Sequence, residues 1–217
     1  MGAISAATKM DRQYRFQRHV YDATRTHYLL WRGRLIKELA PPDGGSVVEI
    51  ACGTGWNIVR AARRYPNASF YGFDISSEML RTAAASVQKN GLENRVKLAQ
   101  GDATDFDLQA MFGLAGADRI FISYALSMIP NWPLAIECAV RALNPGGELS
   151  IVDFGSMDRL PNGPRWAFRL FLKHYNVTPR LNLETVACSV AAANGLSTRF
   201  EQSPRGYSAY AVLKRGP

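Results

Sequence analysis

Residues 47–57 read Val-Val-Glu-Ile-Ala-Cys-Gly-Thr-Gly-Trp-Asn, an apolar strand that ends in a glycine turn and then opens a helix. Gly53 and Gly55 carry no side chain where the backbone must turn sharply and let a ligand come close. The first amides of the helix, from Trp56 onward, are expected to face that ligand. Asp74 follows Gly55 by nineteen residues and ends a second strand, where a carboxylate accepts the hydroxyls of a ribose. The pattern predicts a protein that holds a nucleotide-like cofactor.

The glycine turn differs from that of the dinucleotide-binding enzymes. Those enzymes need a third glycine three positions after Gly55, and this chain has Ile58 there. The difference argues against a pyrophosphate over the helix start, and therefore against NAD or FAD. Two further turns follow at regular intervals: Gly101-Asp102-Ala103 after a strand at 95–99, and Leu-Asn-Pro-Gly-Gly at 143–147 before another strand.

This succession of turns resembles the class I S-adenosylmethionine-dependent methyltransferases, with the glycine turn as Glu49-x-Ala51-x-Gly53-x-Gly55. Ala51 stands where a glycine is often found. The resemblance implies S-adenosylmethionine as the cofactor, with Asp74 on the ribose hydroxyls and Asp102 on the adenine amine. It implies that the cofactor contacts Tyr14, Tyr21, Glu49, Ala51, Gly53, Gly55, Asn57, Asp74, Ile75, Met79, Asp102, Ala103, Ser123 and Tyr124.

The alternation of apolar strands and helices predicts one α/β domain in the 217 residues. A Rossmann-like, mostly parallel, seven-stranded sheet is expected, and the resemblance implies an antiparallel last strand. Three segments are expected: basic N-terminal helices in 1–41 that form a lid and bind an anionic membrane surface, a cofactor-binding core in 46–154, and a substrate-side insertion with a C-terminal hairpin in 155–217. The core strands are predicted at 46–51, 68–74, 95–99, 118–123 and 147–154. Helices are predicted at 56–65, 76–90, 106–112, 132–142, 165–175 and 182–194, and the hairpin at 197–203 and 206–213.

The formal charge of +8 implies an acidic partner, which is RNA, DNA or the anionic face of a membrane. The excess basic charge lies before the glycine turn, in Lys9, Arg12, Arg15, Arg18, Arg25, Arg32, Arg34 and Lys37. The three cysteines include no close pair, which argues against a disulfide framework and against a cysteine-based zinc site. Without a signal-peptide segment or a membrane-spanning apolar run, we expect a cytoplasmic protein that is free or bound to a surface.

Four local strings resemble the bacterial betaine-lipid N-methyltransferases, over roughly residues 11 to 210. They lie at 21–25 (Tyr-Asp-Ala-Thr-Arg), 122–132 (Ile-Ser-Tyr-Ala-Leu-Ser-Met-Ile-Pro-Asn-Trp), 152–155 (Val-Asp-Phe-Gly) and 177–180 (Val-Thr-Pro-Arg). Such enzymes methylate the amine of diacylglycerylhomoserine three times to give diacylglyceryl-trimethylhomoserine. The resemblance implies a peripheral enzyme on the inner face of the cell membrane and a possible partner enzyme that supplies the homoserine lipid. The bacterial phosphatidylethanolamine and ornithine-lipid N-methyltransferases share this organisation, so their substrates remain alternatives.

Candidate catalytic residues are Tyr21, Tyr124 and Asp153. Tyr124 and Asp153 lie at the ends of the fourth and fifth strands, the edge where such sheets bind ligands. Methyl transfer to an amine is an in-line displacement that requires alignment rather than a metal. A quaternary ammonium is held well by aromatic faces, so Tyr14, Tyr21, Tyr28 and Tyr124 are candidates for an aromatic wall. Core packing is the alternative for these tyrosines, and capping of the turn that follows the fifth strand is the alternative for Asp153.

Three cationic side chains are candidates for the substrate side. Arg165 and Arg180 carry planar guanidinium groups suited to a homoserine carboxylate or a lipid phosphate, and His174 is a candidate proton acceptor. Exposed, solvated or structural roles are the alternatives.

A nucleic-acid methyltransferase is a competing interpretation of the basic charge. Enzymes that methylate a base nitrogen typically carry Asn- or Asp-Pro-Pro-aromatic after the fourth strand, whereas residues 123–126 read Ser-Tyr-Ala-Leu. No nucleic-acid partner is therefore expected. A non-catalytic cofactor-binding module would be expected to lose its substrate-side residues, which this chain keeps.

Overall fold

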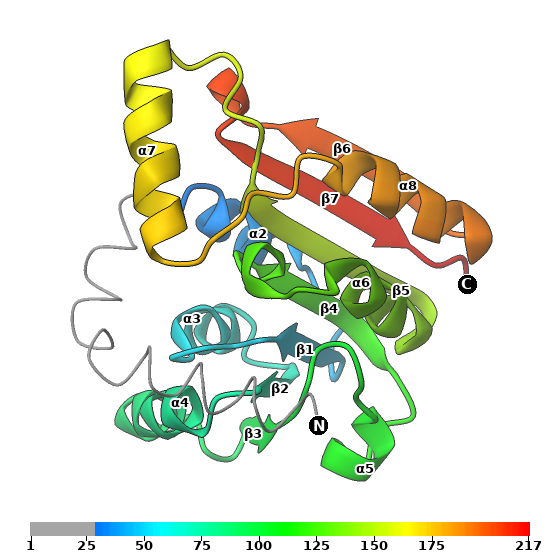
Figure 1. The fold of residues 1–217 in the computed structure, drawn as a ribbon. Coiled ribbons are helices and arrows are strands. Elements are labelled where there is room, and N and C mark those ends of the chain that lie inside the picture. Colours follow the sequence, from blue (N-terminus) through cyan, green and yellow to red (C-terminus); the bar gives the residue numbers. More distant parts are fainter. Residues whose placement is uncertain (1–28) are drawn as a thin grey trace.

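The computed structural model describes residues 29–217, which form a seven-stranded sheet in the order β3-β2-β1-β4-β5-β7-β6 (Figure 1). Strands β1 to β5 are parallel neighbours, and β7 runs antiparallel to both β5 and β6. The predicted α/β fold with an antiparallel last strand is confirmed. The strands are β1 (Ser46–Ile50), β2 (Ser69–Asp74), β3 (Val96–Gln100), β4 (Ala117–Ser123), β5 (Leu143–Phe154), β6 (Ser197–Gln202) and β7 (Ser208–Lys214).

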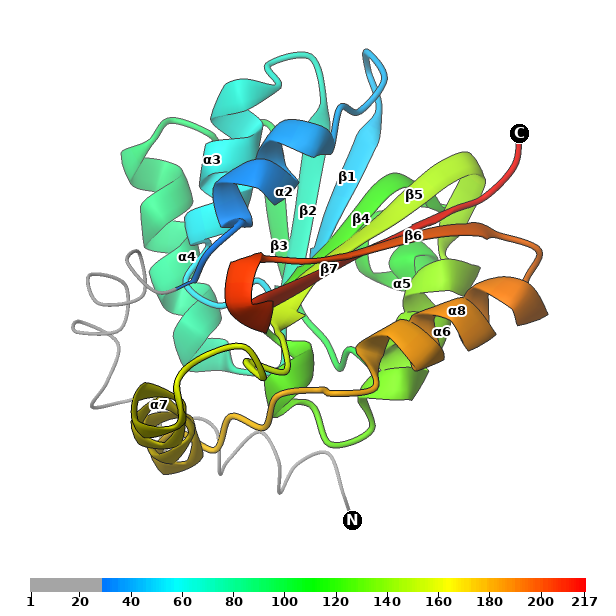
Figure 2. The same cartoon turned by 90° about the horizontal axis from the view of Figure 1, so that it is seen from above.

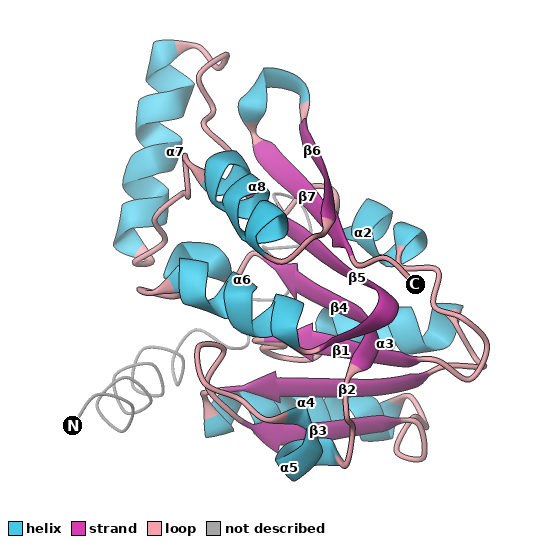
Figure 3. Ribbon diagram, turned by 90° about the vertical axis from the view of Figure 1, so that its right-hand side faces the viewer, coloured by secondary structure: helices cyan, strands magenta, loops and turns pink. Residues whose placement is uncertain are grey.

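Helices cover both faces of the sheet (Figure 2). Helices α2, α3 and α4 lie on one face and α5, α6 and α8 on the other, while α7 stands beyond the edge where β4 and β5 end (Figure 3). The helices are α2 (Arg32–Glu38), α3 (Trp56–Arg64), α4 (Ser77–Lys89), α5 (Leu108–Phe112), α6 (Trp132–Arg141), α7 (Asn162–His174) and α8 (Leu183–Ala193). Two short 3-10 turns complete the fold, η1 (Leu126–Met128) and η2 (Pro204–Gly206).

Strand β4 illustrates why the central part of the sheet is apolar on both faces. Its side chains alternate between faces, as the pleat of a strand requires. Ile120 and Ile122 pack in the core that α6 and α8 cover, and Phe121 packs in the core under α2 and α3. Because both faces are buried at these positions, residues 120–122 form a continuous apolar run.

Strand β5 begins four residues before the predicted start at 147, because Leu143 already pairs with Ala117. The register then shifts before Arg119 pairs with Glu148. Gly146 adopts a φ of 71° in this irregular stretch, a conformation that glycine tolerates best. The Asn-Pro-Gly-Gly turn is therefore a bulge inside the strand.

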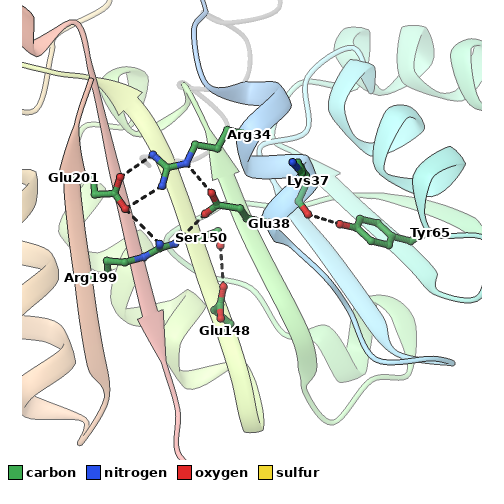
Figure 4. A network of polar contacts seen from close by, with 8 residues as sticks. All are labelled: Arg34, Lys37, Glu38, Tyr65, Glu148, Ser150, Arg199 and Glu201. Atoms are coloured by element: carbon green, nitrogen blue, oxygen red, sulfur yellow. Dashed lines mark hydrogen bonds and ion pairs between the residues drawn. The ribbon is translucent and has the colours of Figure 1, made fainter. Parts of the chain in front are cut away.

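Helix α2 is tied to both of its neighbours by polar contacts (Figure 4). The Arg34 guanidinium donates to the two carboxylate oxygens of Glu201 in β6 at 2.8 and 2.9 Å, and to Glu38 at 2.7 Å. Those hydrogen bonds hold the pKa of Glu201 below its usual value. Tyr65, just after α3, donates its hydroxyl to the Lys37 carbonyl at 2.7 Å. One arginine of the basic N-terminal segment is thus neutralised inside the fold.

Of the basic N-terminal helices predicted in 1–41, one is observed as α2 (Arg32–Glu38). The part of that segment before residue 29 lies outside the described residues. Within residues 29–217, no helix combines the length and apolar character needed to cross a membrane.

Candidate functional site

The predicted cofactor residues gather along one edge of the sheet. Parallel strands end at the same edge, so the turns after β1, β2, β3 and β4 lie side by side there. These turns begin at Ala51, Ile75, Gly101 and Tyr124. The sequence therefore places its candidate residues on a common edge through topology alone.

The glycine turn after β1 has three residues in the left-handed region, with φ of 54° at Ala51, 53° at Gly53 and 78° at Gly55. A Cβ on Gly55 would lie 3.0 Å from the Ala83 Cβ of α4, so glycine is required there for packing as well as for the turn. Around the corresponding position on Gly53, no atom of the described chain beyond Gly53 and its two neighbours in sequence lies within 4 Å. Space for a ligand at Gly53 fits the predicted cofactor turn.

Ala51 is strained, because a residue with a Cβ costs about 1 kcal/mol in this conformation. The strain explains why glycine is often found at the position. The conformation is retained because Cys52 donates its amide to the Phe73 carbonyl at 2.9 Å and Gly55 donates to Cys52 at 3.0 Å.

Asp74 connects the glycine turn to α4. One carboxylate oxygen accepts the Gly53 amide at 2.8 Å and the other accepts the Ser76 amide at 2.9 Å. The side chain of Ser76 caps α4 by accepting the Met79 amide at 3.3 Å. A carboxylate offers about four acceptor positions, so these two hydrogen bonds are compatible with additional ribose hydroxyls. Ile75 is half-buried beside them.

Glu49 is buried beneath the glycine turn and is 1% exposed. It accepts a hydrogen bond from the Asn57 amide nitrogen at 2.8 Å, and its other oxygen has no hydrogen-bond partner within residues 29–217. Burial raises the pKa of Glu49 to about 8, against the lowering effect of Asn57. A buried acid with an unsatisfied oxygen next to the turn fits a cationic group of a cofactor.

Arg32 is a buried cation near the glycine turn, although the sequence analysis counted it only among the basic residues that imply an acidic partner. Its guanidinium carbon lies 3.8 Å from the centroid of the Trp56 ring, at the first residue of α3. The positive charge of Arg32 also opposes the rise in the pKa of Glu49. No spacing rule marks this arginine, because its position depends on how α2 packs on α3.

Asp102 follows β3 and is half-buried. One of its oxygens accepts the Thr104 amide at 2.8 Å and the Thr104 hydroxyl at 2.7 Å, which fixes the turn. The neighbouring Ala103 is buried. Asp102 therefore has a fixed orientation at the same edge as Asp74, and its contact with adenine stays a prediction.

Tyr124 has a φ of 54°, which marks a strained turn directly after β4. Its side chain is 3% exposed and packs edge-on against Phe154, with 4.7 Å between ring centroids. The hydroxyl donates to the Leu30 carbonyl at 2.6 Å and shares a hydrogen bond with the Ser208 hydroxyl at 2.8 Å. Burial raises the pKa of Tyr124 well above its usual value. The structure thus gives Tyr124 a packing role, and contact with a substrate stays a prediction.

Ser123, just before Tyr124, is half-buried. Within the described part of the chain its hydroxyl oxygen is buried without a hydrogen-bond partner. A cofactor contact at this hydroxyl stays a prediction.

Asp153 in β5 has no exposed surface. Its carboxylate accepts the Phe154 amide at 2.7 Å and the Ser127 amide at 3.1 Å. Burial raises the pKa of Asp153 to about 6, although these amides and Arg180 stabilise its charge. Asp153 therefore orients the η1 turn, which follows β4 and differs from the turn after β5 that the sequence analysis considered. Contact of Asp153 with an amine stays a prediction.

Arg180 and the segment before it hold η1 from the other side. The guanidinium donates to the carbonyls of Leu126 at 2.9 Å and Ile129 at 2.8 Å. The Thr178 amide donates to the Ser127 carbonyl at 2.9 Å. Arg180 thus binds backbone, and its predicted contact with a substrate carboxylate is untested.

Arg165 and His174 lie at opposite ends of α7. Arg165 donates to the Asn162 side chain at 2.7 Å, and His174 is exposed with its ring 5.2 Å from that of Tyr175. Nine residues of helix separate the two by about 13 Å along its axis, so they do not converge on one small group.

An aromatic cluster that the sequence analysis did not predict lies where β5 ends. The Phe168 ring of α7 lies 6.0 Å from Phe154 and 5.3 Å from Tyr207, centroid to centroid. Phe168 and Tyr207 are half-buried, so the cluster reaches the protein surface. Only Phe154 belonged to a string singled out from the sequence.

Tyr14, Tyr21 and Tyr28 lie outside the described residues, so their predicted roles stay predictions. Across residues 29–217, no group of three or more acidic, histidine or cysteine side chains is arranged to hold a metal ion.

Comparison of the sequence with protein families identifies a methyltransferase domain over residues 42–195. A curated relative is the demethylmenaquinone methyltransferase of Listeria welshimeri, 29% identical over 140 residues, or 64% of this chain. The matched segment spans 56% of that relative's length.

Solved structures show the same fold at low sequence identity. The YcgJ protein of Bacillus subtilis matches with a TM-score of 0.65 and 18% identity over 86% of this chain and 98% of its own. Phosphoethanolamine N-methyltransferase 2 of Haemonchus contortus, solved with S-adenosyl-L-methionine, matches with a TM-score of 0.70 and 18% identity over 86% of this chain and 52% of its own. The family match covers more than half of the chain and includes the glycine turn, Asp74 and Asp102. This chain therefore belongs to the methyltransferase-domain family, as the succession of turns predicts.

Proposed function

We propose that this protein is an S-adenosylmethionine-dependent N-methyltransferase that methylates the amine of a membrane lipid, diacylglycerylhomoserine. One observation carries the proposal: three of the four strings that resemble betaine-lipid N-methyltransferases are hydrogen-bonded to one another. Ser127, in the string at 122–132, donates its amide to Asp153 in the string at 152–155. The Ser127 carbonyl accepts the amide of Thr178, in the string at 177–180. Strings that are far apart in sequence thus build one substructure at the edge where the turns meet.

S-adenosylmethionine is the methyl donor, and when bound it supplies the activated methyl group. The chain's own residues would hold it in an extended arrangement along the edge. In this arrangement Asp102 accepts from the adenine amine and Asp74 from the ribose hydroxyls. Gly53 admits the ligand to the turn, and Glu49 balances the positive charge of the methionyl part.

The amine must lose its proton before it attacks, and an apolar environment favours its neutral form. The aromatic cluster of Phe154, Phe168 and Tyr207 supplies such an environment, and its ring faces suit the positive charge that grows during transfer. Asp153 and Arg180 fix the η1 turn from two sides and act as positioning residues. The third methylation leaves no lone pair, so the reaction stops at the trimethyl product.

Methylation of a quinone ring carbon is a second candidate. The curated relative at 29% identity, a demethylmenaquinone methyltransferase, favours it. An aromatic cluster also suits a planar ring. The two candidates differ in the acceptor atom, and product analysis separates them directly.

Replacing Asp74 with alanine should weaken S-adenosylmethionine binding by about 1.5 to 3 kcal/mol, because charge-assisted hydrogen bonds to the ribose are lost. Asp107→Ala is the matched control, since Asp107 also accepts two backbone amides, those of Gln109 and Ala110, but at α5. The control should keep its affinity. Calorimetric titration measures both, and an unchanged affinity in Asp74→Ala would remove the ribose assignment.

Cofactor binding should release a proton from Glu49 near pH 7. With a pKa of about 8, Glu49 is mostly protonated in the cofactor-free protein, and a cationic ligand favours the carboxylate. Wild-type affinity should therefore rise relative to Glu49→Gln as the pH increases from 6 to about 8, and then level off. The ratio of wild-type to Glu49→Gln affinity is used because the titration of the cofactor's own amine affects both proteins equally and cancels. Parallel affinity profiles for the two proteins would contradict the linkage.

Mixing the protein and S-adenosylmethionine with detergent-dispersed lipids tests the acceptor. We expect mass spectrometry to detect mono-, di- and trimethylated products from diacylglycerylhomoserine, with Asp74→Ala as the low-activity control. Phosphatidylethanolamine, ornithine lipid, demethylmenaquinone and RNA are offered in parallel. If only phosphatidylethanolamine or ornithine lipid is methylated, the substrate is a lipid amine with a different headgroup from the one proposed. Methylation of demethylmenaquinone or RNA alone would overturn the proposal.

A further inference from the structure

Within residues 29–217, helix α7 packs on the protein through the side that carries Phe168 and Leu172. Leu172 is 1% exposed, and Phe168 contacts the rings of Phe154 and Tyr207. Figures 1 and 3 show the helix standing beyond the ends of β4 and β5, away from both helical layers. The side opposite Leu172 is therefore directed away from the core.

That outward side is apolar. Trp166 is 70% exposed and Leu170 is 53% exposed. They are four residues apart, which places them one above the other on a helix surface. Relative to Leu172, both lie more than a quarter turn around the helix at about 100° per residue. The inward side of α7 is already packed against the protein. The exposed apolar side therefore indicates a binding surface for a separate partner.

The charges of α7 are all positive. The helix contains Arg165, Arg169 and Lys173, and no aspartate or glutamate. Within residues 29–217, the ion pairs involve arginines 34, 81 and 199, and no residue of α7. Lys173 is exposed. It follows Trp166 by seven residues, or two helical turns, and therefore lies on the same side of the helix. The complementary partner is therefore apolar in its interior and anionic at its surface.

We infer that α7 lies in the headgroup layer of an anionic lipid bilayer, with Trp166 and Leu170 inserted and Lys173 on lipid phosphates. Arg165 and Arg169 already donate hydrogen bonds within the protein, to the Asn162 side chain at 2.7 Å and to the Ser156 carbonyl at 3.1 Å. Trp and Leu on one side with Lys and Arg beside them are typical of interfacial helices. The 13 residues of α7 span about 20 Å, too short to cross a bilayer core of about 30 Å. The choice of a lipid surface rests on the proposed function.

The position of α7 relates the bilayer to the site. Residues 155–161 connect the end of β5 directly to α7. A bilayer against α7 would therefore meet the protein at the edge that carries the aromatic cluster and the η1 turn. A lipid headgroup could reach that edge while its acyl chains stay in the membrane.

Cosedimentation of the full chain with vesicles tests the inference. The vesicles are phosphatidylcholine alone or phosphatidylcholine with phosphatidylglycerol. The double variant Trp166→Ala/Leu170→Ala and the single variant Lys173→Glu should each bind the anionic vesicles roughly ten-fold more weakly than wild type. High salt should weaken wild-type binding and reduce the effect of Lys173→Glu.

Two matched controls change the same residue types elsewhere. Leu181→Ala alters a leucine that is 63% exposed outside α7, and Lys89→Glu alters an exposed lysine at the end of α4. Both should bind within about two-fold of wild type, because neither residue lies on α7. Thermal unfolding of all four variants verifies that each is folded.

Equal vesicle binding by the α7 variants and the controls would overturn the inference. So would a loss of self-association or of RNA binding in the α7 variants with vesicle binding unchanged, because the occupant would then be a second copy or a nucleic acid. The detergent assay keeps the proposed function separate, since the α7 variants should methylate dispersed lipid at wild-type rates. If dispersed lipid amines are not methylated but the α7 variants still lose vesicle binding, the proposed function fails and the membrane contact stands.

Discussion

The two hydrogen bonds of the Asp74 carboxylate organise the candidate site. They join the Gly53 amide, in the turn after β1, to the Ser76 amide at the start of α4. The Gly55 backbone fits closely against Ala83 in the same helix. Because the turn and the helix are fixed together, the edge of the sheet is organised before any ligand arrives, and binding need not supply that order.

The substrate side combines a rigid part with an exposed part. Asp153 and Arg180 hold the η1 turn from opposite sides, and Tyr124 is fixed between Leu30 and Ser208. Helix α7 instead offers Trp166 and Leu170 to the surroundings. This division suits the proposed activity, in which two reactants must be aligned and one of them is taken from a membrane.

The fold could be predicted because alternating apolar strands and helices are local patterns. Most predicted boundaries lie within one to three residues of those in the structure. The early start of β5 was not predicted, because the bulge in this strand depends on pairing with Ala117. The roles of Arg180, Asp153 and Arg32 could not be predicted in the same way. Arg180 binds carbonyls more than 50 residues away in sequence, and such partners are set by tertiary packing. The residue type indicated a charged side chain at each of these three positions, but it did not indicate which group that side chain contacts.

A crystal structure of the full chain with S-adenosylhomocysteine tests the central claim most directly. The account predicts both ribose hydroxyls within hydrogen-bond distance of the Asp74 carboxylate, with the bonds to Gly53 and Ser76 retained. It also predicts the adenine amine at Asp102 and the methionyl ammonium group on the Glu49 side of the glycine turn. A ribose held by other side chains, with neither hydroxyl in contact with Asp74, would contradict the account.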